Sequence, residues 1–167
     1  MGLTALSERL HSELLLHGPL YRFYIEAATV AVLFYVGLTD FLTFKIRNEI
    51  VVLLLILYAL FAFVARSRIE VITDISLALA VFGVMLWFYT NGVVGGGDVK
   101  LVAVTCLWVG THCAALFSIL LLALGGLHWL AAKMGWVRTK PMAGRIGIAY
   151  APSVAGALVG TIVLGCL

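Results

Sequence analysis

The run from Leu101 to Ala132 contains no Asp, Glu, Lys or Arg, and this uncharged tract is the feature that most restricts the fold. A membrane-spanning helix needs about 20 apolar residues to cross hydrocarbon about 30 Å thick. The tract is therefore too long for one span, and further apolar runs precede and follow it. A soluble core cannot bury so much apolar surface, so most of it must face lipid.

Composition supports a membrane protein. The 167 residues are 63% hydrophobic and 11% charged, whereas soluble domains are about 45–50% apolar and about 25% charged. The lipid bilayer is thus the first partner that we expect. The net charge of +3 lies in short clusters between apolar runs, which indicates membrane topology and not nucleic-acid binding.

We expect an all-α fold, a polytopic bundle of about six transmembrane helices. Gly110, Thr111 and His112 offer a break that divides the long tract into a short fourth and a fifth helix. The predicted spans are Phe23 to Thr39, Ile50 to Ala65, Val71 to Thr90, two helices within Leu101 to Ala132, and Ile146 to Leu167.

Residues 1–22 form a separate unit in this prediction, ahead of a single membrane domain over residues 23–167. Leu3, Leu6, Leu10 and Leu14 recur at helical spacing, which is typical of an amphipathic helix that lies on the membrane surface without spanning it.

Orientation follows from Lys and Arg, which are enriched in cytoplasmic loops. An external amino terminus leaves four of these residues outside and seven inside. The outer four are Arg9, Arg22, Arg66 and Arg68, and the inner seven are Lys45, Arg47, Lys100, Lys133, Arg138, Lys140 and Arg145. The ends of the first and fourth spans are therefore expected at the cytoplasmic face of the membrane.

Two aspartates lie at those ends, Asp40 after the first span and Asp98 before the fourth. Each has a structural explanation, since Asp98 could cap a helix and Asp40 could be an interfacial charge. Ionisable groups at membrane depth are costly, however, and usually face a polar site or a partner. Two close carboxylates can share a proton and activate a water, as in aspartic proteases.

Gly95, Gly96 and Gly97 immediately precede Asp98. Without side chains they would let an extended peptide approach the carboxylates, and they permit backbone conformations closed to other residues. The alternative is a plain flexible loop.

At this point the chain resembles a known family. "GGGDVKL", Gly95 to Leu101, looks like the GxGD motif of the type IV prepilin peptidases, and "GLTDFLTFKIRNEI", Gly37 to Ile50, is similar to that family's first-aspartate region. "IAYAPSVAGA", Ile148 to Ala157, resembles the start of its last helix. The chain departs from the family pattern at Arg47, where Ile-Pro-Asn is common.

The resemblance implies a membrane aspartic endopeptidase in which Asp40 and Asp98 are catalytic and no cofactor is used. It would lie in a bacterial or archaeal cell membrane and remove short basic leaders from prepilins or pseudopilins at the cytoplasmic face. Pilus assembly machinery would be a further partner. The chain carries no CxxC pair, so the resemblance is to the small peptidase-only branch of tight-adherence (Flp-type) pilus systems, without methyltransferase activity.

Other polar residues have simpler explanations. Lys45, Asn48 and Lys100 could position a substrate, but Asn48 also suits a helix cap and Lys100 an interfacial anchor. Asp74 is expected to cap the third helix. His112 and His128 lack ligand partners at helical spacing, so no metal site is predicted.

Two further expectations concern packing. The three cysteines, Cys106, Cys113 and Cys166, are odd in number and lie in apolar sequence, so we expect buried thiols. Gly156 and Gly160 form a GxxxG pattern for close helix packing, within the bundle or between protomers of an oligomer.

Two other classes of function remain open. Paired aspartates also occur in ion-coupled transporters, where a glycine-rich segment can break a helix at a binding site. A non-catalytic scaffold of a pilus or secretion machine would have the same composition. An interfacial position of both aspartates, and the absence of a visible inverted repeat, favour the peptidase.

Overall fold

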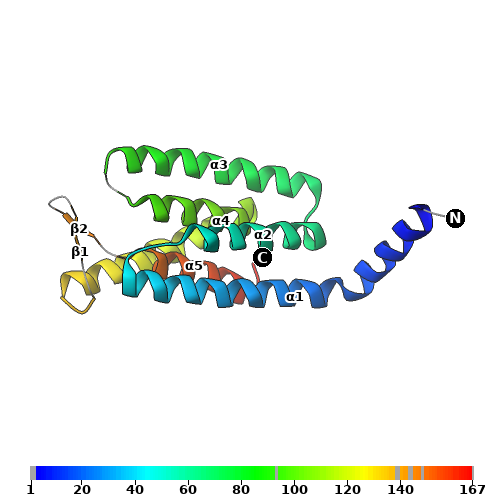
Figure 1. The fold of residues 1–167 in the computed structure, drawn as a ribbon, viewed down its shortest axis with the longest axis horizontal. Coiled ribbons are helices and arrows are strands. Elements are labelled where there is room, and N and C mark those ends of the chain that lie inside the picture. The colour runs from blue at the N-terminus through cyan, green and yellow to red at the C-terminus, as the bar shows by residue number, and fades with distance from the viewer. Residues whose placement is uncertain (1–2, 93, 138–139, 143–144, 148, 167) are drawn as a thin grey trace.

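The structure is a computed structural model that describes residues 3–92, 94–137, 140–142, 145–147 and 149–166. It is a helical bundle with one short β-hairpin (Figure 1). The elements are α1 (Leu3–Thr43), α2 (Asn48–Ala65), α3 (Arg68–Thr90), α4 (Gly96–Lys133), β1 (Lys140–Met142), β2 (Arg145–Gly147) and α5 (Ala151–Val163). Four of the helices are long and apolar enough to cross a membrane, so the chain is a polytopic membrane protein.

The helices lie side by side, and the bundle has two distinct ends (Figure 1). At one end, which we call the hairpin end, α1 finishes, α2 and α5 begin, and the β-hairpin lies. At the opposite end α2 passes into α3. Helix α5 packs against both α1 and α4, while α3 packs on α4. The central position of α5 matters for the site described below.

Helix α1 is longer than predicted. It runs without interruption from Leu3 to Thr43, so the helix of residues 3–22 is continuous with that of the predicted first span. The division into an amino-terminal segment and a membrane domain stays a prediction. The first part of α1 projects away from the bundle (Figure 1), and the stretch with spanning character is Pro19–Thr43. A membrane-surface location for the first part stays a prediction. Because the helix continues to Thr43, Asp40 lies inside its last turn.

The predicted break in the long apolar tract is confirmed. Gly110 has φ 62° and ψ −177°, so α4 consists of two helices that meet at this residue. Figure 1 shows α4 running from the hairpin end toward the opposite end and then back. Residues other than glycine hardly ever adopt these backbone angles, which explains why the reversal occurs at Gly110.

A buried polar cluster surrounds that reversal, and it corrects the assignment of Asp74 as a cap. Ser67 caps α3 in a reciprocal capping box with Glu70. Asp74 is fully buried and accepts a hydrogen bond from the Tyr58 hydroxyl at 3.1 Å, and its carboxylate lies 3.8 Å from Arg66 Nε. The carboxylate thus joins α2 and α3 at the point where α4 turns.

The same region holds the aromatic centre of the core. Trp108 is fully buried and donates its indole N–H to the Leu54 carbonyl at 3.2 Å. Its ring contacts those of Tyr58 and Phe61, with centroids 5.9 Å and 5.2 Å away. These contacts fix the first half of α4 against α2.

The expectation of three buried thiols is wrong for two of them. Cys113 and Cys166 form a disulfide that links α4 to the end of the chain after α5. Their separation of 53 positions hides this pairing in the sequence, because only the reversal of α4 brings Cys113 near the end of α5. Cys106 is a buried free thiol, as predicted.

The last helix starts later than predicted, because Ile146 belongs to β2 and α5 begins at Ala151. Its GxxxG pattern serves packing inside the bundle. A Cβ at Gly156 or Gly160 would lie 3.0 Å from a methyl carbon of Leu124 or Leu120, both on α4. The starts of the second and third helices are close to the predicted Ile50 and Val71, since α2 begins at Asn48 and α3 begins at Arg68.

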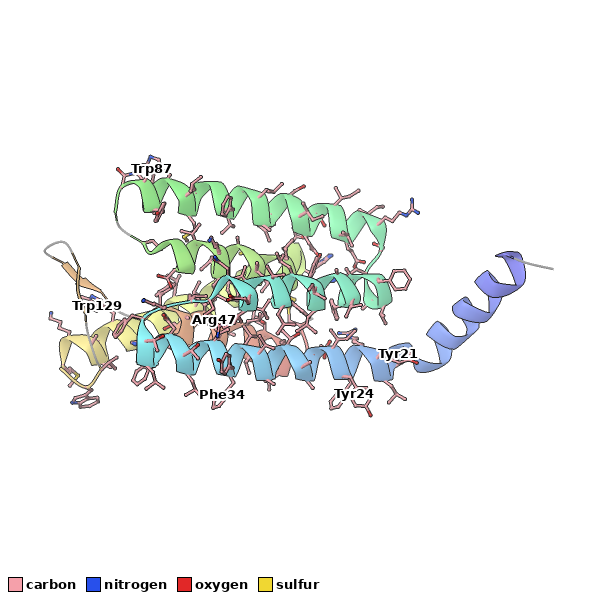
Figure 2. The ribbon with its side chains drawn as sticks, in the orientation of Figure 1. Tyr21, Tyr24, Phe34, Arg47, Trp87 and Trp129 are labelled. Atoms are coloured by element: carbon pink, nitrogen blue, oxygen red, sulfur yellow. A yellow bond between two sulfur atoms is a disulfide. The ribbon has the colours of Figure 1, made fainter. Side chains whose placement is uncertain are left out.

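Exposed aromatic side chains occur toward both ends of the bundle. Trp87 and Trp129 lie toward the hairpin end, and Tyr21 and Tyr24 lie toward the other (Figure 2). Such rings favour the two water–membrane interfaces, where an apolar face and a polar edge are both satisfied. Many large apolar side chains between them, such as Phe34, are also exposed, as on a lipid-facing surface.

Replacement of Gly110 by Ala should destabilise the protein. The new Cβ would lie 2.5 Å from Asp74 Oδ1 at a residue whose φ is positive, and a strained backbone of this kind costs about 1–3 kcal/mol before the clash is counted. Denaturant unfolding of the purified protein in detergent micelles measures the change. Gly126→Ala is the matched control, because nothing lies within 4 Å of its added Cβ. Equal stability of the two variants would contradict the assigned geometry.

The disulfide predicts a defined pattern of cysteine alkylation. In denatured but unreduced protein, iodoacetamide should modify Cys106 alone, and after reduction it should modify Cys106, Cys113 and Cys166. Intact mass before and after reduction reads out the number of groups added. Three modifications without reduction would show that the two helices are not linked.

Candidate active site

Asp40 is held at the hairpin end between α1 and α5. Its side chain is 4% exposed, and its Oδ2 atom accepts a hydrogen bond from the Ala151 backbone N–H at 3.1 Å. The first N–H groups of a helix have no partner within that helix, so Asp40 satisfies one of those of α5.

Asp98 lies in the first turn of α4, three residues after the N-cap residue Gly95. Its carboxylate faces the Gly95 backbone amide. From this position an acidic side chain can reach back to the N-cap residue. The expectation that Asp98 itself caps the helix is therefore wrong, because Gly95 is the N-cap residue. Asp98 nevertheless supports the first turn. A structural role and a chemical role are compatible at this position.

The two carboxylates are brought to the same end of the bundle. Asp40 and Asp98 interact electrostatically, although they are far apart in sequence and lie on different helices. Because like charges close together disfavour double ionisation, the pair can hold one proton between two carboxyl groups. Our prediction that both aspartates face one side is thus in agreement with the fold.

The loop between α1 and α2 lies against the start of α4. A Cβ at Gly97 would lie 3.1 Å from Ile46 Cβ, and one at Gly96 would lie 3.3 Å from the Tyr89 ring. The glycines therefore allow close packing within the protein. Gly95 has φ −74°, and positive φ does not occur at Gly95, Gly96 or Gly97. The expected need for special loop conformations at these three residues is wrong.

Arg47 stands where the resembled family commonly has proline. Its φ of −77° and ψ of 137° lie in the range that a proline ring imposes and that precedes a helix start. The loop therefore has the conformation a proline would favour. Arg47 pairs with Glu49 at 3.3 Å on the surface.

Asn48 and Lys100 contact each other across two helices. Lys100 Nζ donates to Asn48 Oδ1 at 3.0 Å, which joins the start of α2 to the start of α4. Asn48 is therefore not the cap of α2, whose N-cap residue is Arg47. Lys45 is exposed in the loop before α2. A role of these three residues in positioning a substrate stays a prediction.

Sequence reasoning missed three polar residues beside the aspartates. His128 Nδ1 lies 3.2 Å from Ser153 Oγ, and His128 interacts electrostatically with Asp40. Tyr150 lies against Gly125, and burial together with the Asp98 carboxylate raises the pKa of its hydroxyl above the usual value of 10. No local pattern identifies His128, because its neighbours come from α1 and α5.

Within the described ranges, no group of three or more His, Cys, Asp or Glu side chains is placed to hold a metal ion. The groups gathered near the hairpin end are two carboxylates, with a backbone amide donor, an imidazole and two hydroxyl groups near them. One carboxylate can accept a proton from water while the other donates one.

Comparison with known proteins gives one result that bears on identity. Comparisons with curated proteins and with solved structures produced no match. A family description matches residues 27–130, a segment that includes both Asp40 and Asp98. The match covers more than half of the chain, and together with the paired aspartates it shows that the protein belongs to the type IV leader peptidase family.

Proposed function

We propose that the protein is a membrane aspartic endopeptidase that removes the short leader of prepilin-like proteins, with Asp40 and Asp98 as its catalytic residues. The observation that carries the proposal is the meeting of these two carboxylates at one end of the bundle, within the segment that matches the family. Family membership supports prepilins or pseudopilins as substrates.

The reaction needs only a water and the two carboxyl groups. The ionised carboxylate takes a proton from the water, whose oxygen attacks the scissile carbonyl carbon, while the protonated carboxyl group donates its proton to the carbonyl oxygen. Collapse of the tetrahedral intermediate then breaks the C–N bond, and a proton passes to the leaving nitrogen. The electrostatic interaction between Asp40 and Asp98 supports this division of one proton between two groups.

The position of the dyad suits a substrate with a polar leader and an apolar helix. Both aspartates lie at the end of the bundle where α1 finishes and α4 starts, beside helices that present apolar side chains outward. A prepilin could keep its apolar helix in the bilayer while its leader reaches the carboxylates. The absence of CxxC pairs supports a peptidase without methyltransferase activity, as in tight-adherence pilus systems.

The disulfide supports a cytoplasmic active site. Cys113 lies just after the reversal at Gly110, at the end of the bundle away from Asp40 and Asp98. Stable disulfides form mainly on the oxidising, external side of a membrane. An external location for that end leaves the aspartates at the cytoplasmic face, in agreement with the distribution of Lys and Arg.

A transporter and a non-catalytic scaffold would each need the two aspartates for a different purpose. An ion-coupled transporter places its ionisable groups near the midplane of the membrane, whereas Asp40 and Asp98 belong to a last and a first helical turn. A non-catalytic scaffold would need the aspartates only for stability. Cleavage of a prepilin by the purified protein distinguishes the peptidase from both.

Removal of either catalytic carboxylate should abolish cleavage, and the losses should not add. Asp40→Asn and Asp98→Asn should each lower the cleavage rate by roughly 10³-fold or more, and the double variant should be no worse, because the residues act as a unit. The measurement is leader removal from a prepilin reconstituted in detergent micelles, normalised to folded enzyme. Asn preserves size and hydrogen bonding, so helix ends should survive.

Asp74→Asn is the matched control, because Asp74 is the one other aspartate in the sequence and is fully buried at the other end of the bundle. It should change stability but leave the cleavage rate per folded molecule within about threefold. Substantial turnover by Asp98→Asn, or losses that multiply in the double variant, would contradict a shared water and leave Asp98 with a structural role.

Cleavage should not depend on a metal or on a methyl donor. The proposed chemistry uses two carboxylates alone, so leader removal should persist in EDTA, and the new amino terminus should remain unmethylated by mass spectrometry when S-adenosylmethionine is added. Loss of activity in EDTA that zinc restores would refute the proposed mechanism.

A further inference from the structure

The second part of α4 is long enough to reach the lipid headgroups. From Gly110 to Lys133, a helix that rises about 1.5 Å per residue is about 36 Å long, compared with a hydrocarbon layer about 30 Å thick. Figure 1 shows the end of α4 projecting past the end of α1 at the hairpin end. The residues around Lys133 therefore lie where hydrocarbon gives way to headgroups and water.

Large apolar side chains are exposed around this helix end. Trp129, Met134 and Trp136 are 57%, 55% and 77% exposed, and Figure 2 shows Trp129 at the hairpin end. Lys133 is exposed as well, and its ammonium lies 5.4 Å from the centre of the Trp129 ring. Tryptophan rings and the long side chain of lysine both suit the boundary between hydrocarbon and headgroups.

The chain that follows is basic and has no acidic residue to balance it. The sequence places Lys133, Arg138, Lys140 and Arg145 close together, and no Asp or Glu occurs after Asp98. Lys140 begins β1 and Arg145 begins β2, and the pairing of these strands keeps the two residues in one short hairpin. Positive charge is thus concentrated next to the exposed tryptophans.

Carboxylates of the protein do not neutralise this charge. Among the residues with described positions, Lys133 forms no ion pair, and Glu49, which is at the same end, is paired with Arg47. Asp40 is buried. An anionic phospholipid can satisfy both features together, because its phosphate attracts clustered Lys and Arg while its acyl chains contact the tryptophan rings. An acidic soluble protein would meet the charge alone.

We propose that residues 129–147, which we call the basic interfacial segment, bind the headgroups of anionic phospholipids at the hairpin end of the bundle. The segment leads directly to the candidate active site, since β2 ends at Gly147 and α5 begins at Ala151, whose N–H holds Asp40. The lipid site therefore adjoins the aspartates without including them, and the assignment does not depend on the proposed peptidase activity.

Native mass spectrometry of the purified protein measures this preference without any substrate. Phosphatidylglycerol and phosphatidylcholine with the same acyl chains are added in equal amounts to the protein in detergent micelles, and the bound copies of each are counted. Phosphatidylglycerol should bind at least roughly fivefold better, because one basic residue near an anionic headgroup contributes a factor of about five. The preference should shrink when the salt concentration is raised about tenfold.

A double variant removes charge from the basic interfacial segment. Lys140→Gln with Arg145→Gln should lower the ratio of bound phosphatidylglycerol to bound phosphatidylcholine by at least roughly fivefold. Arg9→Gln with Arg68→Gln is the matched control, because it removes the same charge from parts of the chain where glutamates balance the basic residues. The control should leave the ratio within about twofold. Gel filtration identifies variants that fail to fold.

Two further measurements separate a lipid site from a site for free phosphate compounds. Trp136→Ala should weaken the binding of both lipids, because the ring contacts acyl chains whatever the headgroup, and excess glycerol phosphate should not displace phosphatidylglycerol. Equal binding of the two lipids by the unchanged protein, an unchanged ratio in the Lys140 and Arg145 variant, an equal loss in the control, or displacement by glycerol phosphate would overturn the assignment. The proposed peptidase is tested separately by cleavage.

Discussion

The hydrogen bond from the Ala151 N–H to Asp40 is the interaction on which the arrangement of the site depends. It joins the last turn of α1 to the first turn of α5, and α5 in turn packs along α4, which carries Asp98. A carboxylate at this depth is costly unless it has partners, and an unused N–H at a helix start is costly as well. The hydrogen bond between the Asp40 carboxylate and the Ala151 N–H lowers the energetic cost of burying both groups. The helix start that holds Asp40 also positions Ser153 for His128, so backbone geometry and side-chain chemistry are set by the same turn.

A second buried carboxylate shows that ionisable groups in this bundle have different uses. Asp74 is paired with Tyr58 and approached by Arg66, and it occupies the space that a side chain at Gly110 would need. Its contacts join α2, α3 and the reversal of α4, and they involve a cation and a hydroxyl. At the hairpin end the carboxylates face each other's charge instead. The first arrangement is stabilised by opposite charge, whereas the second brings two like charges together, which is what the proposed chemistry requires.

Much of the bundle could be predicted because lipid requires uncharged helical runs of a minimum length. The break at Gly110, the span of α2 and the role of Gly156 and Gly160 in packing follow from such local patterns. The pairing of Cys113 with Cys166, the burial of Asp74 and the neighbours of Asp40 do not, because each depends on helices distant in sequence meeting in space. For the same reason Asp40 and Asp98 could be proposed from spacing and resemblance, whereas His128 and Ser153 could not.

The reversal at Gly110 leaves the first half of α4 short. From Gly96 to Val109, a helix rising about 1.5 Å per residue is only about 21 Å long, compared with a hydrocarbon thickness of about 30 Å. Helix α5, from Ala151 to Val163, is equally short. Both begin beside the aspartates, so the membrane must either thin locally or extend beyond their starts, as hydrophobic mismatch requires. In both cases Asp40 and Asp98 lie below the level of the surrounding lipid headgroups, so under the proposed function a substrate helix must unwind there to bring its peptide bond to them.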